Sequence, residues 1–156
     1  MSFADSREEV VFYVPLWKRN GIEIIDFDNY WRDVHGPVCA RLPGQMEYWQ
    51  YHVSAYEGGI FPELNGINVN SNPEDQFLGI AELTFSNAED RATWFEASAI
   101  LMDDEHNIFS KAIGYTTSPG NTKTVKSEIS EVYPNGSLSE IRYHVMVRKN
   151  DEIGIE

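Results

Sequence analysis

Two histidines, His35 and His52, carry the side chains of this sequence best suited to proton transfer. An imidazole with a pKa of about 6.5 gives or takes a proton near neutral pH, which suits enolisation, cyclisation or dehydration of a carbonyl compound. His35 precedes Gly36-Pro37, which predicts a helix kink, so its ring could instead bond a backbone carbonyl or a carboxylate and order that kink. Both histidines are candidate catalytic residues, and His35 is the leading one.

Aromatic and basic side chains near these histidines could hold a substrate. A tyrosine can bind a substrate oxygen or stack on a ring, whereas tryptophan is more typical of a core. An arginine could hold an anionic group, or pair with a neighbouring aspartate on the helix surface. The candidate substrate-binding residues are Tyr30, Trp31, Arg32, Tyr48 and Tyr51.

The remaining reactive side chains predict no further site. Asp103-Asp104-Glu105-His106 offers metal-binding groups, but four adjacent helical residues point in four directions, so a solvated acidic helix end is the better interpretation. Cys39 is expected to be a buried thiol. No phosphate-binding glycine loop, dinucleotide fingerprint or CxxC pair occurs, so no cofactor and no metal are expected.

The stretch 26–42 must position His35, and it has the pattern of an amphipathic helix capped by Asp26. At about 100° per residue, its apolar residues fall on one face, which we expect to be buried. His35 then lies on the flank of that face, where it could border a cavity. The predicted buried residues are Phe27, Tyr30, Trp31, Val34, Val38 and Leu42.

The other elements follow from period and turn residues. Strands are predicted at 10–17, 46–53 and 77–85, and a fourth within 113–125. A second helix is predicted from the capping box at 86–89 to about Phe109, with Ala92, Phe95, Ala99 and Met102 at helical spacing. The order strand, helix, strand, strand, helix, strand predicts an α+β, ferredoxin-like βαββαβ fold with both helices on one face of an antiparallel sheet.

The first strand is apolar on both sides, so the open face of the sheet also needs cover. A second copy of the sheet is the economical solution, which predicts a homodimer joined face to face. Residues 54–76, rich in Gly, Asn, Pro and Ser, are predicted to form a long loop that could act as a lid. Whether His52 faces the helices is left open.

Two segments are expected along the chain: a domain over 1–126 and an extension over 127–156. The extension contains a probable edge strand at 141–148. Residues 141–150 also align weakly with 11–20, so the start of a second, truncated domain is the alternative.

Composition bounds the partners of this chain of 156 residues. Its formal net charge of −13 disfavours nucleic acid and anionic membrane surfaces. The single cysteine fits a reducing compartment, and no apolar run approaches the roughly 20 residues of a membrane span, so a cytoplasmic location is expected.

The segments 12–19, 26–37, 42–44 and 48–53 together resemble the EthD family of dimeric α+β barrels. They fit its pattern of an aromatic-Trp-Arg-x-x-His-x-Pro helix, a Leu-Pro-Gly turn and a strand ending in His-Val. The match covers roughly residues 10 to 115. The long 54–76 loop and the residues after about 125 depart from a minimal member of the family.

The resemblance implies a homodimer with a cavity between the sheet and the first helix of each subunit. Family members are linked to oxidative breakdown of small organic molecules, and relatives on the same barrel include cofactor-free monooxygenases, polyketide cyclases and heme-degrading enzymes. Three hypotheses follow: an enzyme using His35 on a small organic molecule, as a monooxygenase or as an acid–base catalyst, a non-catalytic binding protein with the same pocket, and, ranked last, a heme protein using His35 or His52.

Overall fold

The computed structural model describes residues 9–53, 65, 72, 75–118 and 147. The chain divides into two units, 1–126 and 127–156, and every element below belongs to the first. The predicted edge strand at 141–148 and most of the predicted loop at 54–76 lie outside the described residues.

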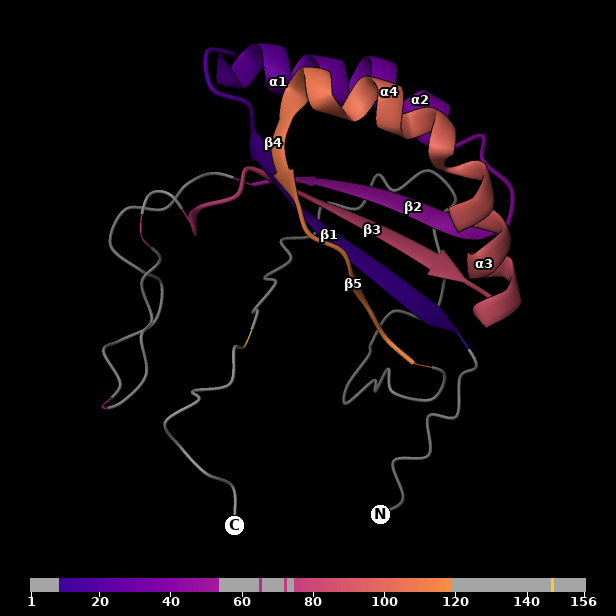
Figure 1. Ribbon diagram of the computed structural model, residues 1–156. Helices are drawn as coiled ribbons and strands as arrows, with labels where there is room; N and C mark the ends of the chain where they lie inside the picture. The colour runs from indigo at the N-terminus through magenta and orange to yellow at the C-terminus, as the bar shows by residue number, and fades with distance from the viewer. Residues whose placement is uncertain (1–8, 54–64, 66–71, 73–74, 119–146, 148–156) are drawn as a thin grey trace, which may run out of the picture. The chain divides into compact units, whose positions relative to one another are not determined.

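A five-stranded antiparallel sheet forms one layer of the first unit (Figure 1). Its order is β2-β3-β1-β4, with β5 also paired to β1. The three long strands start and end within two residues of the predicted ranges, and β5 lies within the predicted 113–125, whereas β4, which begins at Phe109, was not predicted. The strands are β1 Val10–Lys18, β2 Gln45–His52, β3 Gly79–Phe85, β4 Phe109–Ala112 and β5 Tyr115–Thr116.

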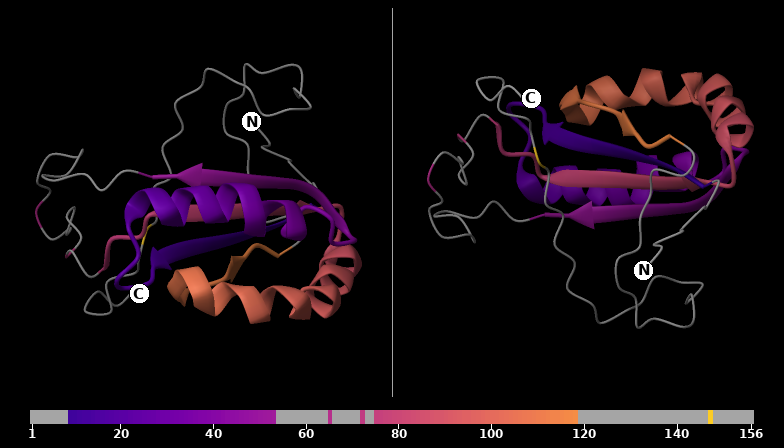
Figure 2. Two further views of the ribbon diagram at one scale, coloured as in Figure 1. Left: turned by 90° about the horizontal axis from the view of Figure 1, so that it is seen from above. Right: turned by 90° about the horizontal axis from the view of Figure 1, so that it is seen from below.

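The helices pack on one face of this sheet, as Figures 1 and 2 show from three directions. With the strand order above, this arrangement is the ferredoxin-like α+β fold, so the predicted fold class is confirmed. The helical elements are α1 Ile24–Tyr30, the π-helical turn η1 Trp31–His35, α2 Gly36–Cys39, α3 Ala88–Ala97 and α4 Ala99–Ile108.

The first helical region differs from the prediction because η1 is a π-turn. The backbone N–H of Gly36 bonds the carbonyl of Trp31, five residues back instead of four. The wider turn shifts the buried face by one residue: Trp31 is followed inward by His35 and Cys39, both at most 5% exposed. The predicted burial of Val34 and Val38 is therefore wrong, since Val34 is 46% exposed and Val38 is 37% exposed.

The start of this region also differs, because the helix begins at Ile24 and its cap residue, Glu23, makes no side-chain cap bond. Asp26 instead lies in the first turn, where its charge favours the positive end of the helix dipole.

The second helical region is two helices, which meet at Ser98. The hydroxyl of Ser98 donates to the Phe95 carbonyl, and Leu101 N–H restarts the helical pattern on the Ser98 carbonyl. The cap is Asn87, whose side chain accepts from Asp90 N–H at 2.9 Å, rather than the predicted Ser86 with Glu89.

The buried face of the second helical region also differs from the prediction by one residue. Trp94, Leu101 and Ile108, spaced by seven, are buried at 3–6% exposure, whereas Phe95 and Met102 are 45% and 70% exposed. The inward side chains of β1 and β3 complete the core with Phe27 and Trp31, which are fully buried.

Three apolar residues on the open face of the sheet have little exposed surface. Val11 and Ile80 are 6% and 1% exposed, and Pro15 is fully buried. Glu82 stands among them and accepts a hydrogen bond from Tyr51 at 3.0 Å.

Candidate functional site

A cavity of about 220 Å³ lies between the sheet and the helical layer. Its wall is mostly apolar, and besides two indole rings it contains five side chains with polar atoms: His35, Cys39, Tyr48, Ser98 and Glu105. This volume is below the roughly 300–1,000 Å³ of a pocket for drug-sized ligands, so a compact molecule suits it. The apolar and aromatic lining residues are Phe12, Val14, Leu16, Trp31, Ala81, Leu83, Trp94, Phe95, Leu101, Met102, Phe109, Ala112 and Gly114.

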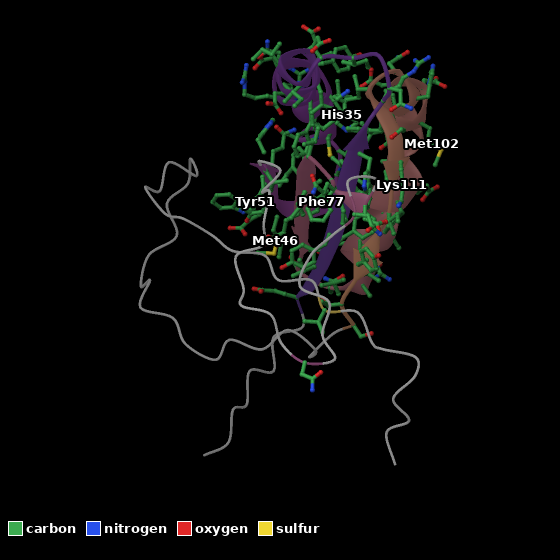
Figure 3. The ribbon with its side chains drawn as sticks, turned by 90° about the vertical axis from the view of Figure 1, so that its left-hand side faces the viewer. His35, Met46, Tyr51, Phe77, Met102 and Lys111 are labelled. Atoms are coloured by element: carbon green, nitrogen blue, oxygen red, sulfur yellow. The ribbon has the colours of Figure 1, made fainter. Side chains whose placement is uncertain are left out.

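His35 reaches this cavity because of the π-turn. It is 5% exposed, and Phe109 contacts its ring edge to face at 5.6 Å between centroids. Figure 3 shows His35 beneath the first helical region, on the side that faces the sheet. Its Nδ1 lies 3.0 Å from Oδ2 of Asp104. Among the described residues, nothing is hydrogen-bonded to its other nitrogen, Nε2.

Asp104 fixes the orientation of this imidazole. Its two carboxylate oxygens are divided between two partners, because the Tyr30 hydroxyl donates to Oδ1 while His35 occupies Oδ2. An ionised Asp104 accepts from both, so Nδ1 carries the proton and Nε2 keeps a free lone pair. The bond to Asp104 raises the pKa of the Tyr30 hydroxyl.

Glu105, the next residue on α4, has a different environment. It is half-buried in the cavity wall, and this burial raises the pKa of its carboxyl group, an effect that nearby His35 partly offsets. Adjacent carboxyl groups thus have opposite surroundings: Asp104 has two hydrogen-bonding partners, whereas Glu105 faces an apolar cavity.

Cys39 and Tyr48 form a neutral polar patch in the cavity wall. Burial raises the pKa of the Cys39 thiol to about 12, and burial likewise raises the pKa of the Tyr48 hydroxyl. Both groups therefore stay protonated at neutral pH and offer weak hydrogen bonds, not charge.

Gln50 connects this patch to the π-turn. Its Nε2 lies 2.9 Å from the Trp31 carbonyl oxygen and 2.9 Å from the Tyr48 hydroxyl. A Cβ at Gly36 would lie 2.6 Å from the same Nε2, so glycine there allows β2 to approach the turn. Strand β2 thereby supports the turn that directs His35 inward.

The structure brings three of the seven predicted site residues, His35, Trp31 and Tyr48, to the cavity wall. Tyr30 lies behind His35, on Asp104. The other three, His52, Arg32 and Tyr51, lie outside the cavity wall.

His52 faces the helices but lies outside the cavity wall. Its Nδ1 is 2.9 Å from Asp28, and its ring contacts Trp31 at 4.6 Å between centroids. Arg32 is on the helix surface, where it pairs with Asp33 at 2.7 Å, as the alternative interpretation expected. Tyr51 is on the open face of the sheet, bonded to Glu82.

Sequence reasoning missed two residues of the site, Asp104 and Glu105, which it placed in a solvated acidic helix end. That interpretation is wrong for these two. A signal was present: Trp94, Leu101 and Ile108 are seven residues apart, and Glu105 falls on their side of the helix, four residues after Leu101.

A metal ion finds no ready site, because within the described ranges no three His, Cys, Asp or Glu side chains are grouped to hold one. Heme would need His35 as its ligand at the cavity, but about 220 Å³ suits a compact ligand better than a porphyrin. None of the helices in the described part combines the length and hydropathy needed to cross a bilayer.

Comparison with known proteins gives a family match and several structural similarities. Residues 19–112 match the family model described as EthD domain. No curated protein sequence matches the chain.

Among solved structures, an EthD-like protein from Ralstonia eutropha JMP134 is similar with 16% identity and a TM-score of 0.47, over 72% of this chain and 92% of that one. An ethyl tert-butyl ether D (EthD) family protein from Bacillus halodurans C-125 has 13% identity and a TM-score of 0.45, over 68% and 96%. SnoaB, a cofactor-independent oxygenase from Streptomyces nogalater, has 9% identity and a TM-score of 0.45, over 80% and 99%.

Proposed function

The chain belongs to the EthD family, and from this premise we propose that it is a small enzyme acting on a compact, mostly apolar carbonyl compound, with His35 as the group that takes a proton. The observation that carries the proposal is a buried imidazole at a cavity, held through Nδ1 by a carboxylate. Such a carboxylate sets the tautomer and stabilises the imidazolium that forms.

The substrate class follows from the wall of the cavity. Apolar and aromatic side chains favour an apolar body, and the small volume limits its size. Among the described residues of this wall, His35 is the one that could carry a positive charge, and it does so only after it has taken a proton. An anionic substrate would therefore find no cation to bind among them, so a neutral molecule with an acidic C–H beside a carbonyl fits better. A monooxygenation in which the substrate itself activates oxygen would use the same proton removal.

Deuterium exchange tests this proposal without the natural substrate. In D₂O, the wild-type protein should accelerate exchange of the protons next to the carbonyl of 2-indanone, followed by proton NMR. His35→Ala should lower the protein-catalysed rate by about 10²–10⁴-fold, the usual contribution of one general base. Thermal melting of each variant checks that it is folded.

The matched control is His106→Ala, which removes an exposed imidazole on α4. It should exchange at the wild-type rate. Equal rates for wild type and His35→Ala would contradict the proposal. Binding of 2-indanone with no acceleration would favour the alternative, a non-catalytic small-molecule binding protein on the same barrel.

We also propose that the protein is a homodimer formed through the open faces of two sheets, and that it works in the cytoplasm. The first proposal is supported by half-buried aromatic side chains on that face, such as Tyr13 and Trp17 on β1. The second is supported by the single cysteine, which is buried and unpaired with any other cysteine. That the protein uses no cofactor, and that it binds neither nucleic acid nor a membrane, stays a prediction.

A further inference from the structure

Glu105 is the cavity residue that the proposed function leaves without a role. It lies on α4, the helix that also carries Asp104, and it lines the same cavity as His35. In the part of the chain that the structure describes, no donor is hydrogen-bonded to its carboxyl group. A half-buried carboxyl group without a protein partner is available to a ligand.

We propose that Glu105 is a second catalytic residue, which gives its proton to the carbonyl oxygen of a neutral substrate while His35 removes the proton from the neighbouring carbon. This inference rests on the proposed function and specifies its substrate: a neutral carbonyl compound that can form an enol.

The step balances as a tautomerisation. Nε2 of His35 takes the proton, the electron pair of the C–H bond forms the C=C bond, and the carbonyl π pair takes the proton of Glu105. The products are an enol, an imidazolium and a carboxylate. No oxidant or reductant is needed, and proton return by the reverse route regenerates both residues.

The surroundings favour this division of roles. Asp104 has Tyr30 and His35 as hydrogen-bonding partners, whereas burial raises the pKa of Glu105 and favours its acid form. Two carboxyl groups with divergent environments are the arrangement expected of an acid and its neighbouring stabiliser. After transfer, the imidazolium and the Glu105 carboxylate attract each other in a cavity of low dielectric constant.

Few other groups could replace Glu105 as the donor. The other titratable groups of the cavity wall are His35 on η1, Cys39 on α2 and Tyr48 on β2, with Asp104 behind His35. Burial raises the pKa values of Cys39 and Tyr48, which makes them poor proton donors at neutral pH. Glu105 is therefore the acid best matched to His35.

The test repeats the 2-indanone exchange assay with Glu105→Gln. The amide keeps the size and can donate a hydrogen bond but not a proton, so the rate should fall by about 100-fold. In the wild type, the rate should also decline with rising pH as Glu105 ionises, and this decline should be absent in the variant. Glu105→Asp, which retracts the acid by one methylene, should be slower than wild type but keep the decline.

Asp103→Asn is the matched control, because it removes one carboxylate from an exposed position two residues earlier on the same helix. It should leave both the rate and the pH profile unchanged. A wild-type rate and profile in Glu105→Gln, with His35→Ala inactive, would overturn this inference and leave the proposed function intact. No exchange by the wild type would contradict both.

Discussion

At the scale of single residues, the site depends on how two adjacent carboxyl groups are surrounded. Asp104 is held by Tyr30 and His35, so its charge is compensated and it orients the imidazole. Glu105 has the apolar cavity instead. One helix therefore supplies a carboxyl group that orients the imidazole and a carboxyl group that favours its proton, although the two side chains differ by a single methylene.

The raised pKa of Glu105 makes folding stability depend on pH. The folded chain holds this proton more tightly than the unfolded chain, so the stabilisation is complete below the ordinary glutamate pKa of 4.5 and is lost as pH rises through the raised value. Glu105→Gln cannot ionise and should avoid this loss. Compared with wild type, we expect Glu105→Gln to have similar stability at about pH 4 and higher stability at about pH 8, by a modest amount because water screens a half-buried charge.

Urea unfolding at the two pH values measures this difference. Asp103→Asn, at an exposed position, should show no comparable gain on raising the pH. A Glu105→Gln variant whose stability follows the wild-type pH dependence would show that Glu105 titrates normally in the folded chain.

At the scale of elements, the π-turn determines which side chains the first helical region buries. A regular helix would bury Val34 and Val38, whereas the wider turn buries His35 and Cys39 and exposes the valines. The π-turn therefore places the imidazole of His35 at the cavity and leaves the two valines exposed to solvent. π-turns inside α-helices are frequent at functional sites for this reason.

The turn is held from the sheet side by close packing of Trp31 on Gly79. A Cβ at Gly79 would lie 2.6 Å from Cζ3 of the Trp31 ring, which is fully buried. Gly79→Ala should therefore lower the free energy of unfolding by about 1–3 kcal/mol, the cost of overpacking a core. It should also slow 2-indanone exchange, because His35 follows Trp31 in the same turn.

A double-mutant cycle with Trp31→Phe isolates this contact, since phenylalanine lacks the part of the indole that meets Gly79. The cost of Gly79→Ala, measured by urea unfolding, should be smaller in the Trp31→Phe background. Equal costs in both backgrounds would show that the ring contact does not set the effect.

Comparison of sequence and structure shows which features were predictable. The three long strands were, because alternating side chains and turn residues mark them directly. The π-turn was not, because Val34 and Val38 fit the regular helical period as well as His35 and Cys39 fit the wider one. In the second region, Phe95 and Met102 are as apolar as Trp94 and Leu101, so composition alone did not select the buried face.

The same limit explains the partial prediction of the site. His35 was found because an imidazole on a helix flank is chemically conspicuous. Its partner Asp104 is distant in sequence, and nothing local pairs them. A carboxylate contact of this kind depends on how two helices pack, which a single sequence does not reveal.

At the scale of the whole molecule, charge and assembly are the relevant properties. A formal net charge of −13 repels anionic ligands and agrees with a neutral substrate. It also opposes self-association, so a dimer must gain enough apolar contact to offset repulsion. On the open face, half-buried aromatic side chains such as Tyr13 and Trp17 offer that contact, since Val11, Pro15 and Ile80 are already buried.

Sedimentation velocity tests the predicted homodimer. We expect one species of twice 17.8 kDa at micromolar concentration. Trp49→Asp, which adds a carboxylate beside Glu82 on the open face, should shift it toward the monomer, whereas Thr93→Asp on α3 should not. A single 17.8 kDa species for the wild type would contradict the dimer. It would not affect the proposed site, because residues of one chain line the cavity.

The π-turn also leaves the first helical region with one residue more than a regular helix needs. Trp31, His35 and Cys39 are spaced by four, and loss of one exposed residue between the first two, such as Asp33, would bring them to the spacing of three and four that an α-helix buries. The imidazole would still point inward after such a deletion. Deletion of Asp33 would thus convert the π-turn into a regular helical turn and keep every side chain that lines the cavity.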